Sequence, residues 1–428
     1  MQRKGKAVVV GGSIAGLSCA HALIAAGWEV VVLEKTTSPP TGCATGAGLG
    51  LDPLSQKIIQ SWLKQPEILD LNTLPLTIDQ NQVTEPDKKI NRVLTRDEDF
   101  NFRAAYWSDL HSLLYRALPL DIVRWGHMFV SYSSSDDKTL VRVNSKTLET
   151  GVVEVTCDLL VAADGCLSSV RRILFPDLKL RYSGYCAWRG VLDCSGNENS
   201  ETFGGLKKAF PDLGRCIYFH LGPKTHIVFY ELLNNRINWI WYVNQVEPQL
   251  KGNSVTMKVS DDMVWQMQKE AECFWPPELV KLIRETKNPF LNVIFDSKPL
   301  DQIAWDNVVL TGDAAHPTTP HGLRSTNMSI LDAAVLGTCL EKWGVENLNS
   351  ALRDYESTRL PVASEQVLFS RWLGRIKQGL AGLDNDGVGP FDPIGVGPEE
   401  CADLQQKNMP FFGDVPTVLS DAVQLEGK

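Results

Sequence analysis

The chain has 428 residues, of which 43% are hydrophobic and 22% charged, a composition typical of a globular protein with a substantial core. Acidic residues outnumber basic ones by 51 to 42, and the net charge of -9 excludes the basic surface expected of a nucleic-acid-binding protein. The 10 cysteines form no Cys-x-x-Cys pair and no Cys/His cluster at zinc spacing. We therefore expect small-molecule partners, no nucleic acid, no metal, and free thiols in a reducing cytoplasmic environment.

The apolar stretch 7–26 follows three basic residues and superficially resembles a secretory signal. Glycines and a serine within 11–16 interrupt the stretch, and a nucleotide-binding turn explains them better. No other stretch approaches the ~20 apolar residues of a membrane-spanning helix, so we expect no membrane span.

The first 35 residues have the order strand, glycine turn, helix, strand, acid. A β-branched run at 7–10 is typical of a buried strand, and the helix after the turn ends at Gly27. In such a unit the helix N-terminus faces a pyrophosphate, and the acid accepts hydrogen bonds from ribose hydroxyls. Because Ser13 replaces the middle glycine of G-x-G-x-x-G, an ordinary βαβ unit is the alternative. We predict dinucleotide contacts at Gly11, Gly12, Ser13, Ile14, Ala15, Gly16, Glu34 and Lys35.

Two later strands also run into loops that carry an Asp beside a Gly, at Asp164 and at Asp313. Ligands of an open α/β sheet bind at the carboxyl ends of its strands, so both loops should face the same crevice as the first turn. A helix that starts after the possible N-cap residues 325–327 brings a second helix N-terminus to this crevice. Local turn and cap roles for Asp313 and Asn327 are the alternative.

Between about 181 and 303 the helix-separated strands give way to a β-meander, with strands at 216–221, 227–233 and 238–243. An apolar sheet face that carries a few polar groups suits a flat aromatic ligand, and the alternative is that these aromatics only form a core. Alternation predicts one face with Tyr218, His220, Tyr230 and Tyr242 and another with Phe219, Phe229, Trp239 and Trp241.

Together these stretches resemble the signatures of the single-component FAD-dependent aromatic hydroxylases, the group A flavoprotein monooxygenases. The resemblance covers about residues 5–360 and includes the run 46–53, similar to the family's loop beside the flavin, and 182–190, similar to the start of its substrate domain. The turn at 11–16, the run 107–110 and the Pro320–His321 pair are most similar to the branch that contains 2,6-dihydroxypyridine 3-hydroxylase.

The resemblance implies a bound FAD and a transient NADPH or NADH, since the chain has a single pyrophosphate fingerprint. In many relatives an Arg stands where this chain has Trp107, and the family's Gly-x-x-Gly-Gln-Gly loop keeps only its first glycine, Gly322. The further FAD contacts implied are Gly48, Leu49, Trp107, Leu110, Asp164, Asp313, Gly322, Leu323, Arg324 and Asn327.

The expected architecture is α/β, with a discontinuous Rossmann-like FAD-binding domain at 1–180 and 304–360. An antiparallel β-sheet substrate domain at 181–303 is inserted into it, and a C-terminal helix and extended tail follow at 361–428. Either a monomer or a homodimer is compatible with these patterns.

The implied activity is a monooxygenase reaction in which NADPH or NADH reduces FAD, and a flavin C4a-hydroperoxide hydroxylates a small aromatic or N-heteroaromatic substrate with oxygen from O2. The resemblance places Pro320 over the flavin, and His316 is expected to be structural. The candidates for activating the substrate by accepting its proton are His220, Tyr218, Tyr230 and His321.

Other flavin-dependent activities are alternatives to hydroxylation. The altered loop 322–325 favours a flavin-binding redox sensor or an uncoupled NAD(P)H oxidase. A flavin-dependent halogenase shares the fold, but its Trp-x-Trp-x-Ile-Pro signature is not met by the run 239–244.

Overall fold

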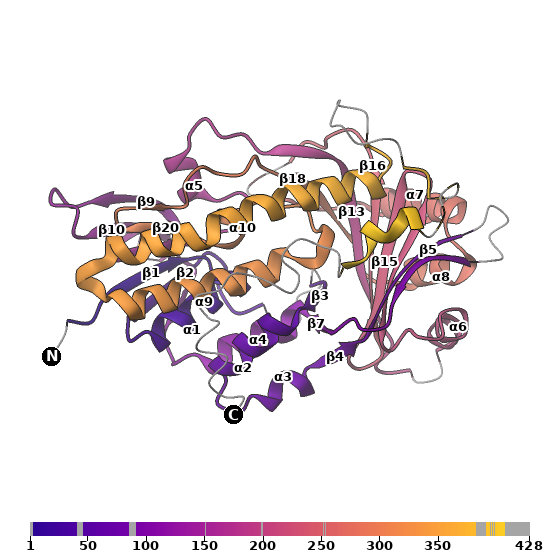
Figure 1. The fold of residues 1–428 in the computed structure, drawn as a ribbon, viewed down its shortest axis with the longest axis horizontal. Coiled ribbons are helices and arrows are strands. Elements are labelled where there is room, and N and C mark those ends of the chain that lie inside the picture. The colour runs from indigo at the N-terminus through magenta and orange to yellow at the C-terminus, as the bar shows by residue number, and fades with distance from the viewer. Residues whose placement is uncertain are drawn as a thin grey trace.

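The computed structural model describes residues 3–40, 46–84, 91–149, 151–197, 200–250, 252, 254–381, 391–393, 395, 397 and 399–406. Figure 1 shows a parallel sheet toward one end of the molecule and a larger antiparallel sheet toward the other, with long helices running between them. Within these residues, no helix is both long and apolar enough to cross a membrane.

The parallel sheet has the order β19 (Ala304–Trp305), β20 (Val308–Leu310), β12 (Leu159–Ala162), β1 (Lys6–Val10), β2 (Glu29–Glu34) and β8 (Val123–Trp125). All neighbours pair in parallel except β19 and β20. The central strands are apolar runs that are buried on both faces, as parallel strands between helices are. This sheet confirms the Rossmann-like part of the predicted fold, and it sets the two Asp-Gly loops beside the first glycine turn.

Helices α1 (Ile14–Ala25) and α9 (Ser325–Trp343) pack against each other beside the parallel sheet, and α10 (Leu348–Lys377) packs on α9. The close approach of α1 and α9 requires Gly337, where a Cβ atom would stand 2.9 Å from the Cβ of Ala22. Helix α10 is continuous through Pro361 and therefore crosses the expected boundary at 360. It runs from the parallel sheet to the antiparallel one (Figure 1).

The antiparallel sheet has the order β17 (Thr256–Met257), β18 (Phe290–Asp296), β13 (Arg181–Asp193), β16 (Arg236–Asn244), β15 (Thr225–Leu232), β14 (Cys216–Gly222), β5 (Ile78–Thr84) and β6 (Asn91–Asp97). The predicted meander is confirmed as β14 to β16. Strands β5 and β6 lie within the segment 1–180 that was expected to belong to the FAD-binding domain, yet they extend this sheet through parallel pairing of β5 with β14.

The predicted division of the meander into two faces was wrong. Alternation within each strand holds, but the register pairs Tyr218 with Phe229 and Phe229 with Trp239, and directly paired residues share a face. One face therefore carries Tyr218, Phe229, Trp239 and Trp241. The opposite face carries Phe219, Tyr230 and Tyr242. Alternation along one strand does not determine which faces of neighbouring strands coincide, because turn geometry sets the register.

The two faces of this sheet are covered differently. Helices α6 (Glu201–Ala209), α7 (Asp261–Phe274) and α8 (Pro277–Glu285) form a core with the face of Trp239. The face of Tyr242 packs against the end of α10, η4 (Glu399–Leu404) and strands β4 (Thr73–Leu76) and β7 (Phe102–Tyr106). The second face therefore turns toward the parallel sheet and its loops.

The remaining elements complete the parallel-sheet end. Strand β3 (Gly48–Leu51) joins β7 and β4 in a small sheet, and β9 (Met128–Ser134), β10 (Val141–Thr147) and β11 (Gly151–Cys157) form another. The others are α2 (Pro53–Trp62), α3 (Glu67–Leu71), α4 (Trp107–Ala117), α5 (Ser169–Leu174), η1 (Gly312–Ala314), η2 (His321–Leu323) and η3 (Val345–Asn347).

Candidate functional site

The first glycine turn forms an open cradle at the N-terminus of α1. Gly11 has φ +105°, and a Cβ atom on Gly16 would overlap the carbonyl oxygen of Gly11. Ser13 makes no side-chain cap, so the first N–H groups of α1 are not capped by its hydroxyl. Gly12 donates its N–H to Glu34 Oε2 at 2.7 Å, which fixes this carboxylate beside the turn. Such a cradle fits a pyrophosphate with its ribose near the acid.

Gly11, Gly12, Ser13, Glu34 and Lys35 line a single cavity, hereafter the nucleotide cavity. Ile14 and Ala15 begin α1 behind it and are not lining residues.

The opposite wall of the nucleotide cavity is formed by Trp107, His111 and Asp164. The ring of His111 donates from Nε2 to Gly12 O at 2.8 Å, and burial lowers the pKa of this imidazole. Sequence reasoning missed His111, although it lies one helical turn after Trp107, with the ring centroids 5.2 Å apart. Asp164 caps α5 by accepting the N–H of Ser169 at 2.7 Å.

Arg171, also missed, ties the two Asp-Gly loops together. Its Nη1 donates to the carbonyl oxygens of Asp313 and Ala314, both at 2.9 Å, and its Nη2 donates to Cys166 O. Asp313 accepts a hydrogen bond from Ser325 Oγ at 2.7 Å, which joins it to the start of α9. The loops therefore form one surface between the nucleotide cavity and a second cavity.

A buried ion network fixes the turn that carries Asp313. Asp332 Oδ2 accepts hydrogen bonds from His316 Nε2 at 2.6 Å and Gly312 N at 2.8 Å, and Asp332 Oδ1 accepts from Arg359 Nε at 2.7 Å. Burial opposes ionisation of Asp332, but His316 and Arg359 outweigh it and hold the pKa of the carboxyl well below its usual range. His316 is structural, as expected, because it anchors the turn rather than facing either cavity.

Arg324 and Asn327 hold the strand β3 in place. Arg324 Nη1 lies 2.6 Å from Asp52 Oδ2, and Asn327 accepts the N–H of Asp52 and donates to Gly50 O. Gly48 at the start of the strand donates to Asn238 Oδ1 at 2.7 Å, which links β3 to the antiparallel sheet. Of the expected flavin contacts, these two side chains bond to protein groups, and Leu110 lies in the hydrophobic core.

The second cavity, hereafter the ring cavity, lies between the Asp-Gly loops and the antiparallel sheet. It unites the predicted residues Gly48, Leu49, Asp313, Gly322 and Leu323 with the predicted Pro320, His321 and Tyr230. Five further polar side chains that line it were not predicted as site residues, and they are Arg189, His226, Tyr242, Asn292 and Lys377.

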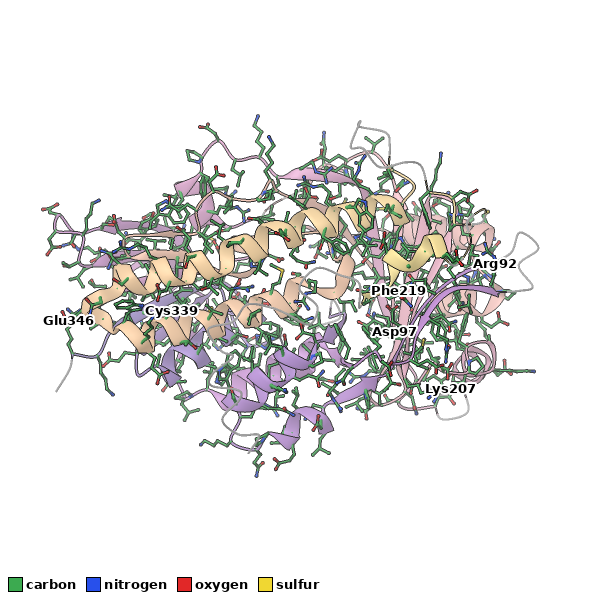
Figure 2. All side chains as sticks on the ribbon, viewed as in Figure 1. Arg92, Asp97, Lys207, Phe219, Cys339 and Glu346 are labelled. Atoms are coloured by element: carbon green, nitrogen blue, oxygen red, sulfur yellow. The ribbon has the colours of Figure 1, made fainter. Side chains whose placement is uncertain are left out.

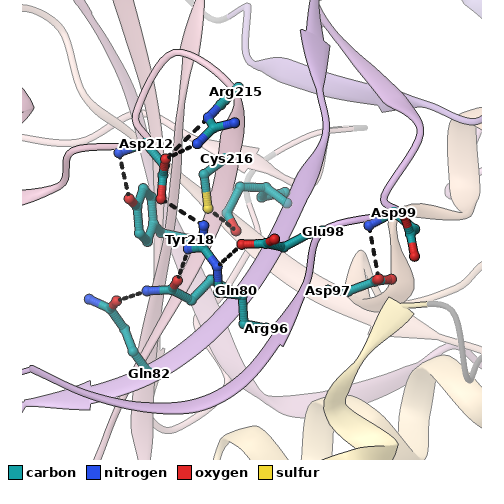
Figure 3. A network of polar contacts seen from close by, with 11 residues as sticks. Gln80, Gln82, Arg96, Asp97, Glu98, Asp99, Asp212, Arg215, Cys216 and Tyr218 are labelled. Carbon is teal, nitrogen blue, oxygen red and sulfur yellow. Dashed lines mark hydrogen bonds and ion pairs between the residues drawn. The ribbon is translucent and has the colours of Figure 1, made fainter.

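Tyr218 and His220 do not reach the ring cavity, because they lie on the opposite face of the sheet. Polar contacts hold both residues there, and Figure 3 shows Tyr218 with the residues from Arg96 to Gln82. Arg96 donates to Gln80, whose amide donates to Gln82 at 2.6 Å, and the Gln82 amide lies 3.0 Å from His220 Nδ1. Since an Arg can only donate, both amides are oriented and His220 Nδ1 is an acceptor. His220 is a structural histidine on these contacts.

His226 has the opposite arrangement. The Asn244 amide donates to the carbonyl oxygen of Gln378 and so accepts the Gln378 amide at its own Oδ1, 2.8 Å away. Gln378 Oε1 is then the acceptor for His226 Nδ1 at 2.7 Å. The proton of the neutral ring therefore sits on Nδ1, and the buried Nε2 lone pair has no partner among the described residues. Burial and the nearby Lys377 lower the pKa of His226 to about 3.

His226 belongs to an aromatic cluster at the base of the ring cavity. Its ring stacks on Tyr242 with centroids 4.4 Å apart, and His321 lies 5.2 Å from it. His321 Nδ1 lies 3.3 Å from both Tyr185 Oη and Thr319 Oγ1. Burial also lowers the pKa of His321, so both imidazoles are neutral. Sequence alternation grouped Tyr230 with Tyr242 correctly, but no motif indicated His226.

Two family models match the chain. The model described as FAD dependent oxidoreductase matches residues 6–160, and the one described as FAD binding domain matches residues 294–370. Between them lies most of the antiparallel sheet, which carries Arg189, His226, Tyr230 and Tyr242 of the ring cavity.

The chain is 26% identical to the 3-amino-4-hydroxybenzoate 2-monooxygenase of Streptomyces cremeus, over 83% of this chain and 84% of that protein. It is 26% identical to the 6-hydroxynicotinate 3-monooxygenase of Bordetella bronchiseptica, over 87% and 93% respectively. The solved structure of 2,6-dihydroxypyridine-3-hydroxylase from Arthrobacter nicotinovorans superposes with a TM-score of 0.75 at 21% identity, covering 92% of this chain and 98% of that one.

Proposed function

On the premise that this chain belongs to the FAD-dependent aromatic hydroxylases, we propose that it hydroxylates a small aromatic or N-heteroaromatic substrate, using O2 and electrons from NADPH or NADH. The observation that carries the proposal is the ring cavity, where flavin-loop residues and an aromatic-lined sheet face meet. The two relatives from Streptomyces cremeus and Bordetella bronchiseptica are named for aminohydroxybenzoate and hydroxynicotinate, which are small hydroxylated rings.

The residues present fit an FAD that spans both cavities. The uncapped start of α1 and the glycine cradle would hold the pyrophosphate, and Glu34 would accept hydrogen bonds from ribose hydroxyls. Asp313 and the loop 320–323 would lie along the ring system, and the start of α9 would favour negative charge there. When bound, this cofactor supplies the activation of O2 and the transfer of oxygen to the ring.

The protein's own contribution is to place the substrate and exclude water. Apolar side chains of the sheet, including Phe219, Val228 and Ile240, line the ring cavity and keep its base dry. Pro320 and His321 close the cavity from the side of the flavin loop.

We assign the activation of the substrate to His226. His226 lines the ring cavity, and its buried Nε2 lone pair, which has no partner among the described residues, would accept a hydrogen bond from a hydroxyl or ring N–H of the substrate. Accepting this hydrogen bond increases the electron density of the ring that is to be hydroxylated. Tyr230 and Tyr242 remain protonated, since burial raises the pKa of both phenols, so they cannot take up the substrate's proton as phenolates and would instead orient the substrate by hydrogen bonds.

The proposal is tested by measuring flavin reduction by NADPH and by NADH, with and without hydroxylated benzoates and pyridines, while peroxide and oxygenated product are both quantified. We expect one class of compound to accelerate reduction and to yield product in excess of peroxide. Reduction that no compound accelerates, with all electrons recovered as peroxide, would instead support the uncoupled oxidase that the altered loop 322–325 suggests.

A further inference from the structure

We infer that the ring cavity contains an anion subsite built by Arg189 of β13 and Lys377 of α10, and that the substrate is therefore a ring bearing a carboxylate. This inference rests on the proposed function for the presence of a ring substrate, but the subsite itself rests on the described side chains.

Arg189 is a partly buried residue whose guanidinium has no partner among the described residues. Its Nε is buried and has no hydrogen-bond acceptor, and the described residues give it no ion pair. Two other buried arginines have counter-charges, because Arg324 pairs with Asp52 and Arg359 pairs with Asp332, and the buried Arg171 is bound by backbone carbonyl oxygens. Burying a guanidinium without a counter-charge is costly, so a cavity-lining Arg of this kind is suited to an anionic ligand.

Lys377 is the second cation. Its side chain is 2% exposed, and its Nζ lies 3.9 Å from the centre of the Phe219 ring and 3.1 Å from Asn81 Oδ1. Phe219 is labelled in Figure 2, where the end of α10 reaches the antiparallel sheet. The nearby carboxylate of Asp79 attracts Lys377, but Asp79 does not line the ring cavity, whereas Lys377 does. Burial lowers the pKa of Lys377 to about 8, which leaves the ammonium mostly charged at neutral pH.

The charges around the cavity are unbalanced. Asp313 is the single acidic side chain that lines it within the described residues, and this carboxylate is engaged by Ser325 on the side of the flavin loop. Arg189 and Lys377 both lower the pKa of His321, so both cations lie around the same aromatic cluster. A ligand that fills the cavity therefore meets positive charge near the His226–His321 cluster, away from Asp313.

The pair of cations and the acceptor at His226 Nε2 together define a class of substrate. One end of the ring carries a carboxylate that pairs with the cations, and the ring also carries a hydroxyl or N–H group that donates to His226 Nε2. A hydroxylated benzoate or a hydroxylated pyridine carboxylate satisfies both requirements. A neutral hydroxypyridine or phenol satisfies only the second.

The test compares acids with the same rings lacking the carboxylate, by titrating the FAD-loaded enzyme and following the flavin absorbance. The pairs are 6-hydroxynicotinate with 2-hydroxypyridine and 3-amino-4-hydroxybenzoate with 2-aminophenol, and benzoate is added as the simplest ring carboxylate. We expect at least one acid to bind about tenfold or more tightly than its neutral partner, the effect of one charge-assisted hydrogen bond.

Lys377→Met and Arg189→Met should remove this preference while keeping similar side-chain volumes. Each is expected to weaken binding of the acid by about tenfold and to change binding of the neutral ring by less than about twofold. Lys269→Met is the matched control, since this lysine is exposed on α7 and lies on the far side of the sheet. Thermal unfolding of each variant reports whether the fold is intact.

Equal weakening of acid and neutral ring by either substitution would overturn the subsite, as would acids that bind no better than their neutral partners or not at all. Tight, cation-dependent binding of an acid without any oxygenated product would leave the subsite standing and would contradict the proposed function instead.

Discussion

Two histidines on neighbouring strands have opposite roles because their hydrogen-bond partners differ. His220 accepts at Nδ1 from an amide chain that begins at Arg96, whereas His226 donates at Nδ1 to Gln378. Both rings are buried, and burial lowers the pKa of each to about 3. The two residues differ because His226 lines the ring cavity and its Nε2 lone pair has no partner among the described residues.

Replacing each histidine by asparagine separates these roles. His226→Asn keeps a donor for Gln378 but removes the acceptor in the cavity, so the rate of substrate hydroxylation should fall about 10²-fold or more, with FAD still bound. His220→Asn keeps the acceptor for Gln82 on the other face and should leave this rate within about threefold. Single-turnover product formation with reduced enzyme measures both. A loss of rate that is equal in the two variants would show that His226 acts only through folding.

The carboxylate of Asp332 holds together the turn of Asp313, α9 and α10. Replacing it by asparagine leaves Arg359 buried without a counter-charge, so Asp332→Asn should lower the free energy of unfolding by about 3–5 kcal/mol at pH 7 and weaken FAD retention. Because the folded pKa of Asp332 is depressed, its contribution is present above the unfolded pKa of about 3.9 and is lost as the pH falls below it. Urea unfolding of both proteins from pH 7 to pH 3 should show that the difference in their free energies of unfolding becomes smaller below about pH 4. A difference that does not change with pH would exclude the ion network as its cause.

The contact between α1 and α9 depends on a glycine that sequence analysis did not single out. Gly337→Ala would place a Cβ atom 2.9 Å from the Cβ and from the carbonyl oxygen of Ala22, so we expect a loss of about 1–3 kcal/mol of stability. Gly205→Ala in α6 is the matched control, since nothing lies within 4 Å of the added atom, and it should stabilise by about 0.5–1 kcal/mol. Thermal unfolding compares the two, and two changes of the same sign would contradict this packing.

At the scale of elements, local patterns predicted what local physics determines. The βαβ unit and the meander have periodicities and turns that are complete within a short stretch, and both are confirmed. The pairing of β5 with β14 joins residues far apart in the sequence, and no local pattern contains it. The face assignment failed for the same reason, because register across strands is a property of the assembled sheet.

At the scale of the whole molecule, the ring cavity collects residues from many separate parts of the chain. Gly48, Arg189, His226, Asp313 and Lys377 meet there, although none is a neighbour of another in sequence. The residues of the glycine turn and the Asp-Gly loops were predictable because such turns and loops follow strands in a recognisable order. Arg189, His226 and Lys377 were not, since a single His, Arg or Lys becomes meaningful only through its partners in three dimensions.

The proposed function requires that this molecule insert oxygen from O2 into an aromatic ring placed in the ring cavity. The most direct measurement is mass spectrometry of the product formed from a substrate that accelerates flavin reduction, under an atmosphere of ¹⁸O2. We expect one ¹⁸O atom per molecule of product, with the second oxygen atom of O2 released as water. A product that carries oxygen from water, or ¹⁸O recovered only as peroxide, would contradict it.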